Sequence, residues 1–182
     1  MLFKLLFILL LRKLKSLFSI YRFYLATGYI PPRGCVIENI NNVSIGNDFT
    51  MGTDCKLFSQ DSESKIIIGD RVSLNYCVSL NADGGGSIIL GDNTIIGPNT
   101  VLRASNHSHE LLMKPIRDQG HSPGKIVLGG NVWVGASVVI LPNVTIGNNV
   151  IVGAGSVVTK DIADNLIVAG VPAVTIKKRV DV

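Results

Sequence analysis

The sequence predicts an all-β fold, a parallel β-helix in which short strands wind into stacked triangular coils. The first indication is an aliphatic residue that recurs every six positions over most of the chain. The second is the composition, because charged residues make up only 16% of the chain and aromatic residues 6%, whereas there are 19 glycines. Abundant Val, Ile and Gly suit short strands joined by tight turns. The 182 residues correspond to a single domain.

The six-residue repeat is clearest in the C-terminal third of the chain. Each unit supplies one short strand and one turn, and three units complete a coil of ~18 residues. We therefore expect Val134 to stack on Val152, and Ile140 on Val158, one coil later. Such inward-facing ladders would contribute roughly 1.5–3 kcal/mol per buried side chain. The uninterrupted series consists of Leu128, Val134, Ile140, Ile146, Val152 and Val158.

Residues 1–30 predict a different element, an amphipathic helix that is both basic and apolar. Six basic residues and no acidic residue occur in residues 1–37. The uncharged run within this segment is shorter than the ~20 apolar residues that a bilayer-spanning helix needs. At ~100° per residue, four of the bases fall on one arc of the helix, with apolar residues around the rest of it. These four are Lys4, Arg12, Lys15 and Arg22.

We expect residues 1–25 to lie in the interface of an anionic membrane, which would make the protein peripheral on the inner face of the cytoplasmic membrane. Two alternatives are a helix packed on a partner subunit or on the domain's own end, and a cleaved signal peptide. A nucleic-acid partner is disfavoured, because the bases lie among Leu and Phe and not on a polar face with stacking aromatic residues.

The remaining chain divides at its prolines and at the ends of the repeat. Pro31-Pro32 ends the helix, and residues 31–42 are expected to form a linker. Residues 43–165 are expected to form the β-helix domain, with a protruding loop at 103–125, and residues 166–182 a C-terminal extension. The three cysteines lack the spacing of metal ligands, so no metal site is expected and the thiols should be free, as in a reducing compartment.

The repeat is interrupted at residues 81–87 and 103–125, and insertions in stacked repeats form loops that often carry function. The second interruption contains all three histidines of the chain, His107, His109 and His121. An imidazole can take and return a proton near neutral pH. The alternatives are solvated loop histidines without a role, and a metal site built on His107 and His109 for which the spacing gives no third ligand.

Two sequence runs carry a resemblance to a known family. ILGDNTIIGPNTVLRASNH precedes the histidine loop, and NVWVGASVVILPNVTIGNNVIVGAGSVVTKDIADNLIVAGVPAVTIKKR follows it. Together they resemble the hexapeptide-repeat acyltransferases, and in particular the bacterial sugar O-acetyltransferases that act on maltose, on galactosides, or on capsule and lipopolysaccharide. The resemblance covers residues 43–179. It implies a left-handed β-helix, assembly into a homotrimer, and acetyl-CoA as co-substrate without a metal.

The resemblance also implies roles for individual residues. His107 would be the general base that deprotonates the acceptor as it attacks the thioester directly, without a covalent enzyme intermediate. His109 competes with it for this role, and Glu110 or Asp83 would orient the imidazole. The acceptor pocket would be formed by Asn81, Asp83 and Asn106.

Acetyl-CoA would bind in a groove between neighbouring subunits. Trp133 would pack near the thioester, although an ordinary buried tryptophan is the alternative. The basic residues after the last coil could meet the nucleotide phosphates or be merely solvated. The implied cofactor residues are Trp133, Ala136, Ala154, Thr159, Lys160, Lys177, Lys178 and Arg179.

The implied reaction is O-acetylation of a sugar, with an acceptor held at the membrane, such as a lipid-linked polysaccharide precursor, because the basic apolar helix departs from the simple sugar acetyltransferases. One alternative is an N-acetyltransferase acting on a nucleotide-linked amino sugar. A second is a non-catalytic or metal-dependent β-helix protein.

Overall fold

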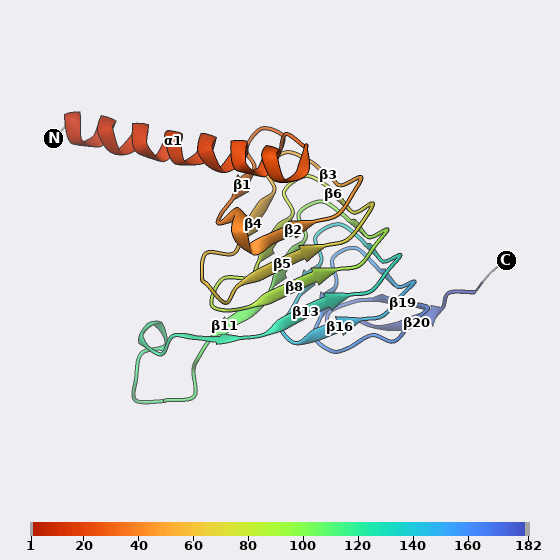
Figure 1. The fold of residues 1–182 in the computed structure, drawn as a ribbon. Helices are drawn as coiled ribbons and strands as arrows, with labels where there is room; N and C mark the ends of the chain where they lie inside the picture. The colour runs from red at the N-terminus through yellow and green to blue at the C-terminus, as the bar shows by residue number, and fades with distance from the viewer. Residues whose placement is uncertain (1, 181–182) are drawn as a thin grey trace.

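The computed structural model describes residues 2–180, which form one helix followed by a parallel β-helix (Figure 1). Three parallel sheets, named here A, B and C, form the sides of the triangular coil. The chain passes through them in the order A, B, C in each turn. Sheet A consists of β1 (Val36–Ile37), β4 (Lys56–Phe58), β7 (Ser79–Asn81), β10 (Val101–Arg103), β15 (Val139–Ile140) and β18 (Val157–Val158).

The other two sheets complete the coil. Sheet B consists of β2 (Val43–Ile45), β5 (Lys65–Ile68), β8 (Ser87–Leu90), β13 (Lys125–Leu128) and β16 (Val144–Ile146). Sheet C consists of β3 (Thr50–Met51), β6 (Ser73–Leu74), β9 (Ile95–Ile96), β14 (Trp133–Val134), β17 (Ile151–Val152), β19 (Leu166–Ala169) and β20 (Val174–Lys178).

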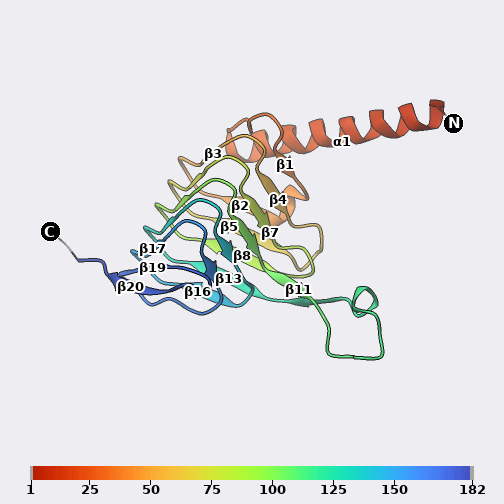
Figure 2. The same ribbon diagram turned by 180° about the vertical axis from the view of Figure 1, so that it is seen from behind.

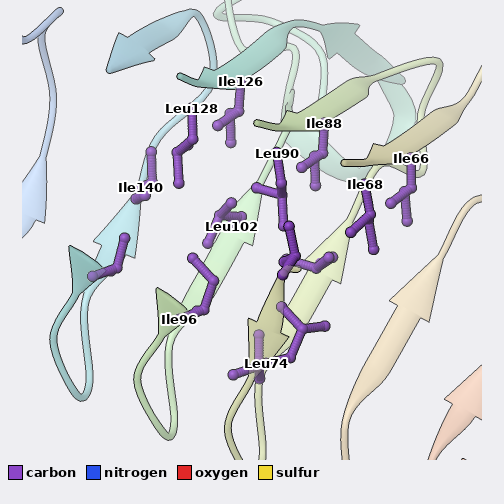
Figure 3. Close-up of a cluster of buried hydrophobic side chains, with 14 of the residues drawn as sticks. Ile66, Ile68, Leu74, Ile88, Leu90, Ile96, Leu102, Ile126, Leu128 and Ile140 are labelled. Atoms are coloured by element: carbon purple, nitrogen blue, oxygen red, sulfur yellow. The ribbon is translucent and has the colours of Figure 1, made fainter. Parts of the chain in front are cut away.

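The aliphatic residues of the repeat fill the inside of the coil. Figure 3 shows inward-pointing side chains stacked from one coil to the next, such as Leu90 with Leu128. The two stacking pairs expected from the repeat are confirmed, because Val134 is the register partner of Val152 and Ile140 that of Val158. All four side chains are buried. The predicted parallel β-helix is therefore the observed fold.

The coil extends slightly further than the expected range of 43–165. At its start, β1 pairs in parallel with β4, which places Ile37 opposite Leu57. At its end, β19 pairs in parallel with β17, and Val168 is buried against the last coil. Strand β20 then turns back antiparallel to β19 and closes sheet C.

All the long excursions leave the coil at one corner, between sheet A and sheet B. They follow β4, β7 and β10, and the third is much the longest. At the other two corners the turns are short, and asparagines often adopt the left-handed backbone that a tight turn requires. Asn131 and Asn149, for example, have φ of 56° and 58°, and the Asn131 Nδ2 donates to Asn149 Oδ1 at 2.8 Å.

Helix α1 (Leu2–Thr27) covers the N-terminal end of the coil with its C-terminal part only. There Phe23 is fully buried, Ser19 Oγ donates to the carbonyl of Ile37, and Arg22 donates to Asn41 Oδ1 at 2.6 Å. The helix then extends well past the coil (Figures 1 and 2). No helix within residues 2–180 is long and apolar enough to cross a membrane.

Candidate active site

The excursion after β10 forms a two-stranded hairpin that carries all three histidines. Strand β11 (Ser105–His107) pairs antiparallel with β12 (His121–Pro123), and a short 3-10 helix, η2 (Ile116–Asp118), lies in the tip between them. The hairpin protrudes from the coil (Figure 1). A side chain on it is therefore accessible to a large substrate.

Two of the histidines face each other across this hairpin. His107 and His121 are register partners, and their ring centroids are 4.3 Å apart with 35° between the planes. Both residues are exposed. Among the hydrogen bonds of residues 2–180, none involves a ring nitrogen of His107, so this imidazole is free to accept a proton from a substrate hydroxyl.

The third histidine binds the backbone of its own turn. His109 Nδ1 lies 3.2 Å from the carbonyl oxygen of His107, and Glu110 Oε2 accepts from the His109 amide at 3.0 Å. The pKa of Glu110 is lowered by its own amide and by that of His109. The Glu110 carboxylate thus bonds to main chain and not to the His107 ring. The structure places His121, and not His109, beside His107.

The shorter excursion after β7 supports the base of the hairpin. The Ala104 amide donates to the carbonyl of Asn81 at 2.9 Å, and Ser105 Oγ donates to the carbonyl of Asp83. A Cβ built on Gly84 would lie only 3.0 Å from Ser105 Oγ and 3.1 Å from His121 Cβ. The structure therefore places the backbone of Asn81 and Asp83 next to the histidine strands.

The side chains of the expected acceptor residues point in different directions. Asp83 Oδ1 accepts from the Gln60 amide at 2.7 Å, so this carboxylate is engaged by backbone and does not bond to an imidazole. Asn106 lies between Ser105 and His107 on β11, and successive side chains of a strand alternate between its faces. Its amide therefore leaves the hairpin on the face opposite the His107 ring.

One contributor was missed in the sequence, namely the excursion after β4. There Asp61 Oδ2 accepts from the amide of Gly84, and this hydrogen bond lowers the pKa of the Asp61 carboxyl. Gln60 holds Asp83 from the same segment. The available signal was the polar run SQDSES, which separates two aliphatic series of the repeat.

The expected cofactor residues lie elsewhere on the coil. Trp133 is 53% exposed on the outer face of sheet C, between Ile95 and Ile151 in the register of neighbouring strands. The alternative of a buried tryptophan is therefore wrong. Ala136 and Ala154 occupy adjacent turns at the corner between sheets C and A, where the Gly155 amide donates to the Ala136 carbonyl at 2.8 Å.

The remaining expected cofactor residues also lie at the surface of the coil. Thr159 and Lys160 are exposed at the corner between sheets A and B, just after β18. Lys177 and Lys178 pair with β19. A groove of about 550 Å³ lies at the corner between sheets B and C, lined by Asn131, Asn149, Asn165, Lys178, Arg179 and Val180.

Sequence comparisons relate the chain to transferases. The family described as "Bacterial transferase hexapeptide (six repeats)" matches residues 125–160. A protein of Escherichia coli K12 named for O-acetyl transfer in lipopolysaccharide biosynthesis, WbbJ, is 32% identical over 79% of this chain and 76% of its own length. The chain belongs to the hexapeptide-repeat transferase family.

A second relative and a solved structure agree with this membership. The galactoside O-acetyltransferase of Escherichia coli K12 is 42% identical over 63% of this chain, and the match spans only 55% of that protein. The crystal structure of a single-substitution mutant of AntD, an N-acyltransferase from Bacillus cereus, in complex with dTDP and coenzyme A superposes with a TM-score of 0.69 at 30% identity, covering 81% of this chain and 79% of that one.

Family membership specifies the hand and the character of the coil. Hexapeptide repeats form the left-handed parallel β-helix, as the sequence predicts. Within residues 2–180 no group of three or more His, Cys, Asp or Glu side chains could hold a metal ion. The histidine hairpin is an insertion between two strands of the hexapeptide scaffold.

Proposed function

We propose that this protein is an acetyl-CoA-dependent O-acetyltransferase that acts on a sugar hydroxyl in surface polysaccharide biosynthesis. One observation carries the proposal, namely the exposed His107 ring with both nitrogens free, on a hairpin that leaves a hexapeptide coil. The names of WbbJ and of the galactoside enzyme support O-acetylation of a saccharide.

The proposed reaction is a direct transfer. The His107 imidazole takes the proton of the sugar hydroxyl while the hydroxyl oxygen attacks the thioester carbonyl and forms the new C–O bond. The C–S bond then breaks, and the imidazolium returns its proton to the leaving thiolate. The products are the acetyl ester and coenzyme A, and no acyl group is held on the protein.

A homotrimer would complete this site. In one chain His107 leaves the corner between sheets A and B, whereas Trp133 lies on the outer face of sheet C. The exposed row of Ile95 and Trp133 is apolar, as expected for a face that packs against a second copy. We propose that the hairpin of one protomer meets the cofactor residues of its neighbour, and sedimentation equilibrium should then give three times the monomer mass.

The decisive test of the function is a pair of histidine variants. With acetyl-CoA and a panel of glycans, His107→Ala should lower kcat by about 10²–10⁴-fold, the contribution of a general base. The matched variant His109→Ala should keep a rate close to that of the unmodified protein, since its ring bonds only to backbone. Near-normal turnover by His107→Ala would remove the proposed mechanism.

Amide formation is the second candidate function, and the structural similarity to AntD favours it. The two reactions differ in the lability of the product. An acetyl ester on a sugar is lost in mild base, whereas an acetamide is retained. A base-stable product formed from a dTDP-linked amino sugar would therefore replace O-acetylation by N-acetylation, with His107 in the same role.

We further propose that α1 holds the protein on the inner face of the cytoplasmic membrane, where the acceptor would be a lipid-linked glycan. The helix carries an exposed apolar surface together with the basic residues that anionic lipids attract. The histidine hairpin projects to the same side of the coil as α1 (Figures 1 and 2). The exposed apolar side chains of α1 are Phe7, Leu10, Leu11, Leu14, Leu17, Phe18, Tyr21, Tyr24 and Leu25.

Vesicle sedimentation tests this attachment. The protein should pellet with vesicles that contain phosphatidylglycerol, and less with pure phosphatidylcholine. The double variant Leu14→Glu, Leu17→Glu should abolish pelleting, because each side chain is more than half exposed on α1. Ile176→Glu is the matched control, since Ile176 is 59% exposed at the other end of the coil. Equal pelleting of both variants would refute the attachment.

A further inference from the structure

His121 is a histidine to which the resemblance assigns no role. It begins β12, on the strand that returns from the hairpin tip to the coil. Its ring lies 4.3 Å from that of His107, centroid to centroid. No other ring lies against His107 among the aromatic pairs of residues 2–180.

The hairpin register explains why these rings meet. The Ser108 amide donates to the Gly120 carbonyl at 3.0 Å, which makes 108 and 120 a hydrogen-bonded pair. Pairs alternate along an antiparallel ladder, so His107 and His121 form the non-hydrogen-bonded type, in which facing side chains lie closest. The backbone register therefore places the two histidine side chains next to each other.

The turn at Gly84, after β7, lies close to His121. Gly84 has φ of 82°, and a Cβ placed on it would come within 3.1 Å of His121 Cβ. Ser105, on the same face of the hairpin, is fully buried and donates to the Asp83 carbonyl. The face of the hairpin that carries His107 and His121 therefore contacts the coil at Ser105 and Gly84.

We propose that His121 is a positioning residue that stacks on the His107 ring and holds its plane toward the acceptor. The interplanar angle of 35° makes the contact a tilted stack, in which both ring nitrogens of His107 stay free. A general base must be held close to the proton it removes, and misplacement by about 1 Å can cost ~10²-fold. This inference rests on the proposed function, with His107 as its base.

Three substitutions separate stacking from hydrogen bonding. His121→Phe keeps a ring without nitrogens, His121→Asn keeps a polar nitrogen without a ring, and His121→Ala keeps neither. Stacking predicts that His121→Phe stays within about 3-fold of the unmodified kcat, whereas Asn and Ala lower kcat by ~10-fold or more. KM for acetyl-CoA should stay within about 2-fold in all three, because His121 is assigned to the acceptor side.

The control and a second readout keep the outcomes distinct. Met113→Ala alters a side chain that is 99% exposed in the tip between β11 and β12, and should leave kcat unchanged. By proton NMR, the His107 ring signals should lose their ring-current shift in His121→Ala and keep one in His121→Phe, whether or not the protein is an acetyltransferase. Unchanged kcat in His121→Ala, or a His121→Phe variant as slow as His121→Ala, would overturn the inference. An active His107→Ala would instead overturn the proposed function.

Discussion

Gly84 offers the sharpest test of how the coil supports the histidine hairpin. Three glycines near the hairpin, Gly84, Gly85 and Gly120, have φ of 82°, 78° and 82°. An alanine at any of them pays about the same backbone cost, ~1–2 kcal/mol for an L-residue in the left-handed region. They differ in what the new Cβ would meet.

The contacts of that Cβ distinguish the three positions. At Gly84 it would lie 3.0 Å from Ser105 Oγ and 3.1 Å from His121 Cβ, which is too close without movement. At Gly85 the nearest atom would be Pro123 Cβ, at an ordinary 3.5 Å, and at Gly120 nothing lies within 4 Å. Only Gly84→Ala must therefore displace Ser105 or His121, by a few tenths of an ångström.

We expect Gly85→Ala and Gly120→Ala to lose a similar amount of stability, with Tm lowered by about 2–8 °C for ~1–2 kcal/mol in a chain of this size, and Gly84→Ala to lose more, because its Cβ also meets Ser105 and His121. Below that Tm, kcat for acetyl transfer should fall ~10-fold in Gly84→Ala and stay within about 2-fold in the other two. Calorimetry and a thiol assay for released coenzyme A measure the two quantities. Equal kcat values in the three variants would show that contact between residue 84 and the histidine hairpin does not affect the rate of acetyl transfer.

Three further predictions concern the coil itself. Leu102→Ala removes a fully buried side chain from β10 and should lower the free energy of unfolding by ~2–5 kcal/mol in urea titrations. A loss below ~1 kcal/mol would contradict close packing around Leu102. Burial raises the pKa of the Cys55 thiol to about 11 in the folded protein, above the unfolded value of ~8.5. The buried neutral thiol therefore contributes its full stabilisation of the fold below pH ~8.5, and this stabilisation is lost as the pH rises toward 11. The urea midpoint should accordingly fall more steeply over this range than in Cys55→Ala, and parallel slopes would contradict it. The Gly84 amide lowers the pKa of the Asp61 carboxyl, so the stabilisation from this hydrogen bond is present above pH ~3.9 and is lost as the pH falls through the lowered pKa. Asp61→Asn should speed hydrogen exchange of the Gly84 amide at neutral pH. Unchanged exchange would show that the hydrogen bond does not hold the turn at Gly84.

The regular part of the fold could be predicted because each inward position has the same requirement. The inward positions at the six-residue spacing are filled by large apolar side chains in successive coils, so the stacking of Val134 on Val152 follows from the phase of the repeat. The phase of the repeat also predicts which way the Trp133 side chain points. It precedes an inward-facing Val134, and alternation along a strand places it outside, where it is found.

The candidate site was less predictable, because its geometry depends on contacts between excursions. The sequence singled out the loop and its histidines but could not pair His107 with His121, since a strand register is set by the turn and not by composition. The hydrogen bond from the Gly84 amide to the Asp61 carboxylate joins two coils, so residues near each other in the sequence give no sign of it. For the same reason, Asp83 was expected beside an imidazole, whereas it binds the Gln60 amide.

The gathering of every long excursion at the corner between sheets A and B has a consequence for how such proteins diversify. Chain length can vary at that corner without changing which strands are neighbours in any sheet, since each strand still pairs with the same position one turn away. Under the proposed function, a change of acceptor would require exchange of these surface segments alone. The faces that carry Trp133 and Ala154 would stay the same, so one donor site would serve different acceptors.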